Sequence, residues 1–393
     1  MTSTLRKHLA TAFGVALLLV AEAATAVAQP GDPSPVEQLR RDSEAIHALG
    51  VSGVQARVVG SDGRQSVATS GTADLATGRP VSSDGWFRMA STSKTLIATV
   101  VLQMEGEGRL SLDDTVDHWL PEVVQGNGND GTRITVRQLL QHTSGIHDDL
   151  PGYTTPREYY QQRHNVYSPG QLVARAMAHA PDFPPGGGWE YSNTGYVLLA
   201  MIIEKVSGHA AHREIEDRVL DPLGLEHTRT MDASPTLPEP HAQAYQLFGP
   251  ESRVDVTDQI PVDYQNLSWV TTTQDENAFF RALLAGRLLP ARQLGEMKQT
   301  VPVSAEVEKL WPGGRYGLGL VERPLSCGGS YWSHEGGDGG YITLNGVTDN
   351  GTRSAVVSMS EARGDSSDHI LGQENAASVL IDHALCSGYG VSS

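Results

Sequence analysis

The sequence predicts an α/β protein in which an antiparallel sheet, flanked by N- and C-terminal helices, carries a mostly helical inserted domain. Short β-type segments stand near both ends of the chain, within residues 51–71 and 316–359. A helical pattern of apolar residues precedes the first group, and another follows the second. Between the two groups, helical patterns alternate with loops rich in proline and glycine.

The first 28 residues are typical of a secretory signal peptide. Arg6 and Lys7 precede an apolar run, and Ala26-Val27-Ala28 supplies the small residues of a cleavage site. The run of about 12 residues is shorter than the roughly 20 that a membrane span needs. We therefore expect cleavage near Ala28 and Gln29 and a secreted protein that no longer contacts the membrane.

The N-terminal elements follow in order. Residues 36–49 place apolar side chains on one helical face, and residues 51–59 and 66–71 form a predicted hairpin around a Ser-Asp-Gly turn. The apolar run 90–107 is too long for a strand and predicts a buried helix. Further helical windows lie at 136–141, 170–180, 196–206 and 278–284.

The last hundred residues change character. Predicted strands lie at 316–322, 330–334, 341–347 and 354–359. A helical pattern at 370–385 should pack on the sheet that these strands form. We therefore assign residues 29–109 and 300–393 to an α/β sheet domain and 110–299 to the inserted, mostly helical domain.

Composition narrows the possible partners. A net charge of −17 argues against nucleic acid and anionic membranes. In an oxidising compartment, the only two cysteines, Cys327 and Cys386, favour one disulfide over two separate buried thiols. No CxxC or HExxH spacing occurs, so we predict neither a metal nor a cofactor. We expect a monomer.

The strongest chemical candidate is the Ser-x-x-Lys pair Ser91 and Lys94 at the start of the predicted helix. Residues three apart share one helical face, so the two side chains can meet. A serine hydroxyl needs a proton acceptor, and a lysine can serve where burial or positive neighbours lower its pKa. The chain has only five lysines, and only Lys94 follows a serine at this spacing. A helix cap with an unrelated lysine is the alternative.

Two further segments contain suitable chemistry. Tyr191 could exchange protons with the serine, and Asn193 could bind a substrate amide, although a capped helix start with a packing tyrosine is favoured if this segment is taken alone. Near the end of a predicted strand stand His334 and Glu335, followed by Gly336 and Gly337. Glycines there let a substrate approach, and the Gly337 N–H could stabilise an oxyanion. A glycine-rich turn is the alternative.

These three segments, in this order and with about 100 and 140 residues between them, resemble the motifs of the penicillin-recognising serine hydrolases. The likeness is strongest to secreted actinomycete D-alanyl-D-alanine carboxypeptidases, with class C β-lactamases and related esterases further off. It implies a β-lactamase/DD-peptidase-like fold. Further matching segments are residues 110–114, 142–145, 273–275 and 316–320.

The resemblance implies roles for individual residues. Ser91 would be the acylated nucleophile, Lys94 its proton partner and Tyr191 a general acid or base. His334 would stand in place of a basic residue of the third motif. The carboxypeptidases are also similar in placing one cysteine seven residues before the motif histidine and another at the end of the last helix, which supports the disulfide.

The sequence departs from this family at three places. Glu335 stands where a threonine usually helps to hold a substrate carboxylate, and an ionised glutamate would repel one. Val321 replaces a carboxylate-binding arginine, although Arg323 lies two residues on and therefore on the same strand face. Near Trp269 a longer stretch of the relatives is absent, so this tryptophan is either a pocket wall or a core residue.

The sequence therefore predicts a D-alanyl-D-alanine carboxypeptidase that acts through an acyl-enzyme. The implied partners are a peptidoglycan stem peptide or a related acyl donor, with β-lactams as inhibitors. An esterase, amidase or β-lactamase on the same scaffold is the first alternative, favoured by Glu335 and Val321. A catalytically silent cell-wall-binding protein is the second.

Overall fold

A large antiparallel sheet brings the two ends of the described chain together. The computed structural model describes residues 33–250, 252–262 and 268–386, so the predicted signal peptide lies outside the described residues. The ten strands are β1 (Gly53–Val59), β2 (Gln65–Asp74), β3 (Arg79–Pro80), β11 (Val301–Pro302), β12 (Arg315–Tyr316), β13 (Val321–Pro324), β14 (Ser330–Ser333), β15 (Gly336–Asp338), β16 (Tyr341–Thr348) and β17 (Ser354–Met359). Their order is β11-β12-β13-β14-β16-β17-β1-β2-β3, with β15 paired to β16.

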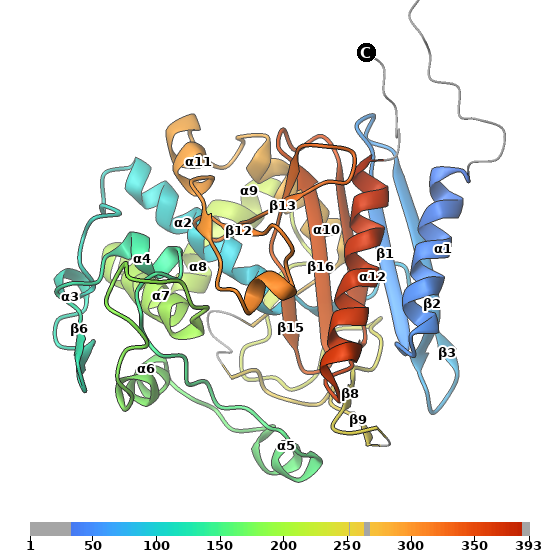
Figure 1. The fold of residues 1–393 in the computed structure, drawn as a ribbon, viewed down its shortest axis with the longest axis horizontal. Coiled ribbons are helices and arrows are strands. Elements are labelled where there is room, and N and C mark those ends of the chain that lie inside the picture. The colour runs from blue at the N-terminus through green and yellow to red at the C-terminus, as the bar shows by residue number, and fades with distance from the viewer. Residues whose placement is uncertain (1–32, 251, 263–267, 387–393) are drawn as a thin grey trace, which may run out of the picture. The chain divides into compact units, whose positions relative to one another are not determined.

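The first and last helices pack together on this sheet. Helix α1 (Pro35–Ala48) contacts β1 and β2, and α12 (Ser367–Cys386) contacts α1, β16 and β17. Ser34 caps α1 by accepting a hydrogen bond from the Glu37 N–H. Helix α12 approaches β16 so closely that a Cβ at Gly346 would lie 2.4 Å from the Ile381 side chain. Figure 1 shows the blue α1 and the red α12 beside the sheet.

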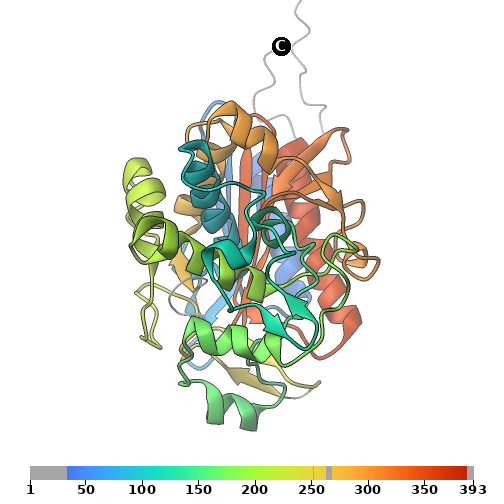
Figure 2. The ribbon, with the colours of Figure 1, turned by 90° about the vertical axis from the view of Figure 1, so that its left-hand side faces the viewer.

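Helix α10 (Thr273–Leu284) also packs against the sheet and contacts β1, β16 and β17. Helix α2 (Lys94–Gly106) packs against α7 (Asn193–Ser207), and most residues of both are buried. The shorter helices include α4 (Val136–Leu140), α6 (Pro169–Met177) and α8 (Ala211–Ile215). Figure 2 shows this helical region in front of the sheet. The predicted fold class is confirmed, and the division into two domains at 110 and 299 stays a prediction.

The structure corrects the expected strand at 316–322. Residues 317–320 form a turn instead, because the Gly317 N–H bonds to the Leu320 carbonyl at 2.7 Å and Gly319 adopts a φ of 79°. The turn joins β12 and β13 into a hairpin in which Tyr316 pairs with Val321. An apolar run broken by two glycines therefore contains a bend that its alternation pattern does not reveal.

Short strands that the sequence did not predict support the helical region. Strand β10 (Trp269–Thr271) lies between β4 (Phe87–Arg88) and β7 (Arg229–Thr230). A second small sheet contains β8 (Tyr245–Leu247), β9 (Arg253–Asp255) and β18 (Glu361–Ala362). Strands of two or three residues have too few positions for a detectable alternation.

The predicted disulfide is confirmed. Cys327 and Cys386 are bonded, with their Cα atoms 5.7 Å apart, and the bond ties the β13–β14 loop to the end of α12. Across the ranges that the structure describes, no helix has both the length and the apolar character needed to cross a membrane.

Candidate active site

Ser91 and Lys94 meet at the start of α2, where the sequence placed them. Strand β4 leads into a 3₁₀ turn, η1 (Ala90–Ser93), which contains Ser91 and continues directly into α2. The Lys94 Nζ lies 3.0 Å from the Ser91 Oγ, although Lys94 is only 1% exposed. Ala90 has a φ of 52°, a left-handed conformation that costs an alanine energy and persists only where the surroundings enforce it. The geometry suits proton transfer from the serine to the lysine.

The second motif, Tyr191-Ser192-Asn193, orients Lys94 from the start of α7. Asn193 accepts a hydrogen bond from the Lys94 Nζ at 2.7 Å and donates one to Asp148 at 2.7 Å. Asn193 thus links Lys94 to Asp148, while its contact with a substrate amide stays a prediction. Asp148 also accepts the Thr194 N–H at 3.0 Å. No motif marks Asp148 in the sequence, and only the fold shows that it anchors this loop.

The Tyr191 side chain lies over Lys94. The Lys94 Nζ is 4.9 Å from the centre of the phenol ring. Burial raises the pKa of Tyr191 well above its usual value, and the nearby Ser91 hydroxyl opposes that shift. At neutral pH the phenol therefore keeps its proton and can donate it.

The third motif, His334-Glu335-Gly336, packs against the turn of the first motif through Gly336. A Cβ at this glycine would lie 2.3 Å from the Met89 carbonyl oxygen, so no larger residue fits against the turn that contains Ser91. The Thr92 hydroxyl donates to the His334 carbonyl at 3.2 Å and ties the same two segments together. The close approach explains why a glycine follows Glu335 in the motif.

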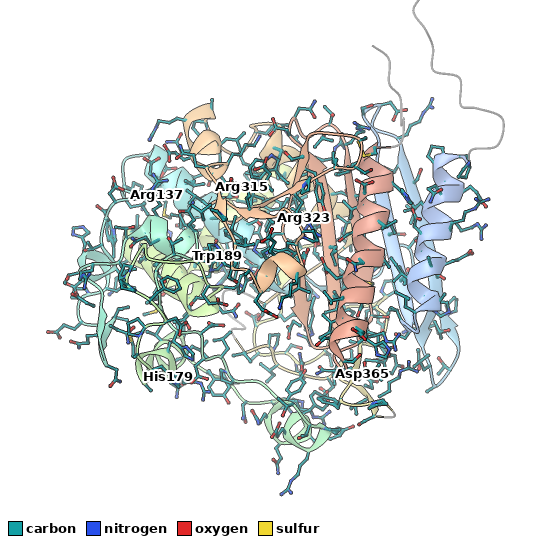
Figure 3. The ribbon with its side chains drawn as sticks, viewed as in Figure 1. Arg137, His179, Trp189, Arg315, Arg323 and Asp365 are labelled. Carbon is teal, nitrogen blue, oxygen red and sulfur yellow. A yellow bond between two sulfur atoms is a disulfide. The ribbon has the colours of Figure 1, made fainter. Side chains whose placement is uncertain are left out.

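Arg323 is paired with Glu335 and does not present a free cation to the cleft. Arg323 is 6% exposed, and its Nη1 lies 2.5 Å from Glu335 and 3.1 Å from Glu374. The Trp311 indole N–H donates to the second Glu335 oxygen at 2.7 Å. The expectation that Arg323 itself contacts substrate is therefore wrong, because its guanidinium lies behind Glu335. Figure 3 labels Arg323, together with Arg315 on the neighbouring strand.

A cleft of about 450 Å³ opens beside Ser91. Tyr191, His334, Glu335 and Glu374 are among the residues that line it. Its apolar lining residues include Val307, Leu310, Trp311, Ile342 and Ile370.

Trp269 does not reach this cleft, since its side chain is fully buried in the core between β4 and β7. The pocket-wall alternative for Trp269 is therefore wrong. Gly336 and Gly337 do line the cleft, while the oxyanion role of the Gly337 N–H stays a prediction.

His334 lies at the cleft but is not the cation that the resemblance implied. It is 1% exposed, and burial, with a further contribution from the charge of Lys94, lowers its pKa to about 3. A neutral imidazole therefore stands where the family has a basic residue. It gives no net attraction for a substrate carboxylate.

A buried carboxyl behind the third motif leads to a test of stability against pH. Glu276 is fully buried and accepts a hydrogen bond from Asn345 at 2.7 Å, and Asn345 holds both the N–H and the carbonyl of His334. Burial raises the pKa of Glu276 to about 8 from an ordinary value of 4.5. The unfolded chain therefore binds fewer protons than the folded one between these values. We expect the free energy of unfolding to fall as pH rises through this window, on the order of 1.4 kcal/mol per pH unit.

Urea unfolding at pH 5, 6.5 and 8 measures this slope. Glu276→Gln, which keeps the hydrogen bond from Asn345 without a titrating group, should be markedly less sensitive to pH across the same window. Equal slopes for the two proteins would show that Glu276 does not retain its proton.

Comparisons with known proteins agree with this geometry. A family model described as Beta-lactamase matches residues 37–380. A D-stereospecific amidohydrolase from a Streptomyces species is 38% identical, with a TM-score of 0.77, and the match covers 86% of this chain and 97% of that one. A structure of D-amino acid amidase from Ochrobactrum anthropi SV3 is 25% identical, with a TM-score of 0.74 over 90% of this chain and 98% of that one.

Two named relatives match over shorter segments. Penicillin-binding protein 4* of Bacillus subtilis is 35% identical over 159 residues, which are 40% of this chain and 34% of that protein. Esterase EstB of Burkholderia gladioli is 33% identical over 181 residues, 42% of this chain and 43% of that protein. The matched part thus spans less than half of each of these relatives. Because the family model covers most of the chain and the whole fold agrees, the protein belongs to the beta-lactamase family of serine hydrolases.

Proposed function

We propose that this protein is an amidohydrolase that cleaves amides or esters of apolar D-amino acids through an acyl-enzyme on Ser91. Glu335 is the observation that carries the proposal. Its carboxylate lines the cleft beside Ser91, and its bond to Arg323 neutralises that cation on strand β13. His334 is uncharged. A substrate carboxylate beside the third motif would meet the Glu335 carboxylate and no free cation from His334 or Arg323, whereas an amide or ester needs no cation there.

The cleft and the relatives support the choice of substrate. Its apolar lining, with Trp311 and Ile342 near the third motif, suits an aliphatic or aromatic side chain. The two solved structures described above are a D-stereospecific amidohydrolase and a D-amino acid amidase, which supports D-stereochemistry.

The reaction has two steps. The Ser91 oxygen attacks the carbonyl carbon while the uncharged form of Lys94, with its Nζ 3.0 Å away, takes the hydroxyl proton. Tyr191, held protonated by burial, supplies a proton to the leaving amine as the amide bond breaks, and its proton is replaced from Lys94. Water then adds to the acyl-enzyme and returns Ser91, with its proton passing through the same groups. A β-lactam would acylate Ser91 in the same way and leave slowly.

A D-alanyl-D-alanine carboxypeptidase is the second candidate. The observed Cys327–Cys386 disulfide matches the cysteine positions of the secreted carboxypeptidases, and penicillin-binding proteins are among the relatives. In this case the acyl donor would be a peptidoglycan stem peptide. Both candidates agree with an exported protein, which we also propose, because disulfides persist in oxidising compartments.

A substrate panel distinguishes the candidates. Steady-state hydrolysis is compared for D-phenylalanine amide, L-phenylalanine amide, a D-Ala-D-Ala peptide, a short ester and a cephalosporin, with Ser91→Ala as the blank. We expect kcat/KM for D-phenylalanine amide to exceed that for the D-Ala-D-Ala peptide by about tenfold or more, because the terminal carboxylate of the peptide would face Glu335. Faster cleavage of the peptide would select the carboxypeptidase. Equal rates for the two enantiomeric amides would contradict D-specificity.

A further inference from the structure

A line of buried hydrogen bonds runs behind the cleft from the second motif to the third. The Ser192 N–H donates to the His142 Nδ1 at 3.1 Å. The His142 Nε2 lies 3.1 Å from the Tyr316 hydroxyl, and the same hydroxyl lies 3.0 Å from the His334 Nε2. The His334 Nδ1 lies 2.8 Å from the Glu335 carbonyl oxygen. The three side chains are at most 1% exposed.

The two ends of this line determine where every proton lies. A backbone N–H can only donate, so the His142 Nδ1 carries no proton, and the proton of the neutral ring is on Nε2. That N–H donates to the Tyr316 oxygen, which leaves the Tyr316 proton for the His334 Nε2. At the other end a carbonyl can only accept, so the His334 Nδ1 carries the proton. The two ends independently require the same donor-to-acceptor direction for the hydrogen bonds along this line.

We propose that His142, Tyr316 and His334 form a neutral hydrogen-bond relay. The relay holds Tyr191 and the third motif in the positions that the reaction at Ser91 needs, with His142 and Tyr316 as positioning residues. The proposal rests on the proposed function only in giving Ser91 and Tyr191 their part in the reaction. It does not depend on which acyl donor is used.

His142 bonds to the backbone on both sides of Tyr191, at Glu190 and at Ser192. Its carbonyl accepts the Glu190 N–H at 3.1 Å, and its ring accepts the Ser192 N–H. Its imidazole also lies against the Tyr191 ring, with the ring centres 4.3 Å apart. His142 has a φ of 60°, a conformation that a non-glycine residue keeps only where other contacts enforce it. The relay supplies such contacts.

The surroundings keep both imidazoles uncharged. Burial lowers the pKa of His142 well below its usual value, with a further contribution from Lys94, and His334 shifts in the same direction. A charged His142 would present a proton on Nδ1 to the Ser192 N–H. The other groups whose rings face His142 are Trp189, Tyr191 and Tyr196. A positive charge on either histidine would break the relay and add repulsion beside Lys94.

Nitrogen-15 NMR of the intact protein labelled in histidine tests the proton positions directly. His142→Asn and His334→Asn identify the two signals by their loss. At pH 7 we expect opposite tautomers, with the proton on Nε2 in His142 and on Nδ1 in His334. The same tautomer in both rings, or a doubly protonated ring in either, would overturn the proposal. This result does not depend on activity, so it separates failure of the relay from failure of the proposed function.

A matched pair of variants tests the effect on the reaction. Tyr316→Phe removes the centre of the relay, whereas Tyr159→Phe removes another buried phenol that donates to a backbone carbonyl, that of Asp258, at 2.9 Å. On any ester that the wild type hydrolyses, we expect Tyr316→Phe to lower kcat on the order of 10- to 100-fold with little change in KM, because misplacement of reacting groups acts on the chemical step. Tyr159→Phe should keep the wild-type kcat.

Two outcomes of the kinetic test count against the relay. An unchanged kcat in Tyr316→Phe would remove its positioning role, and equal losses in both variants would assign the effect to lost stability. Melting temperatures of the two variants show whether each is folded. If Tyr316→Phe does not fold, the NMR result on the wild-type protein decides the proposal.

Discussion

Replacing Ser91 by alanine is expected to abolish acylation and to lower hydrolysis by about 10⁴-fold or more, because no other group can form the covalent intermediate. The Ser91 Oγ is the atom that meets the Lys94 Nζ at 3.0 Å and lines the cleft. Intact-mass analysis after incubation with a penicillin should show one adduct on the wild type and none on Ser91→Ala.

The matched control for this experiment is Ser234→Ala, which changes a partly exposed serine whose hydroxyl bonds only within its own turn among the described residues. It should form the same adduct as the wild type. An adduct of equal yield on Ser91→Ala would place the nucleophile elsewhere. A wild type without any adduct would remove penicillin recognition but would leave amide hydrolysis to the substrate panel.

The second large effect is expected on stability. Arg323→Leu should lower the free energy of unfolding by roughly 3–5 kcal/mol, because it leaves the half-buried Glu335 and the buried Glu374 without their shared cation. Glu335 and Glu374 both bond to the Arg323 Nη1, and Arg323 is itself 6% exposed. Burial and then the charge of Glu335 raise the pKa of Glu374 well above its usual range. Urea unfolding at pH 7 measures the loss.

Two further variants separate charge from packing. Arg323→Leu combined with Glu335→Gln removes one of the unpaired charges and should recover part of the stability. Arg315→Leu, on the neighbouring strand, removes an exposed arginine that bonds to Thr300 and should cost about 1 kcal/mol or less. If Arg315→Leu and Arg323→Leu cost the same, the buried ion pairs do not contribute as described.

The fold was largely predictable because its main elements have long, regular patterns. The buried helix after Ser91 and the strands at 341–347 and 354–359 have enough positions for periodicity to be recognised. The bend at 317–320 and the short strands around Trp269 were not predictable. Their geometry depends on a few hydrogen bonds to segments far away in the sequence, such as the Met89 N–H to the Trp269 carbonyl at 2.8 Å.

For the site, the sequence by itself determined the residue types and the order of the three motifs. It indicated Ser91 and Lys94 because their spacing is local and a helix places both on one face. It also marked Glu335 as a departure that disfavours a substrate carboxylate.

Only the tertiary structure decided how these residues are paired. Arg323 lies behind Glu335, Asn193 binds Lys94, Trp269 is in the core and His334 is neutral. Each of these facts depends on burial or on a partner that is distant in sequence, such as Asp148, Glu374 or Tyr316. Motif spacing does not encode burial, and burial determines both the charge state and the orientation of a polar side chain.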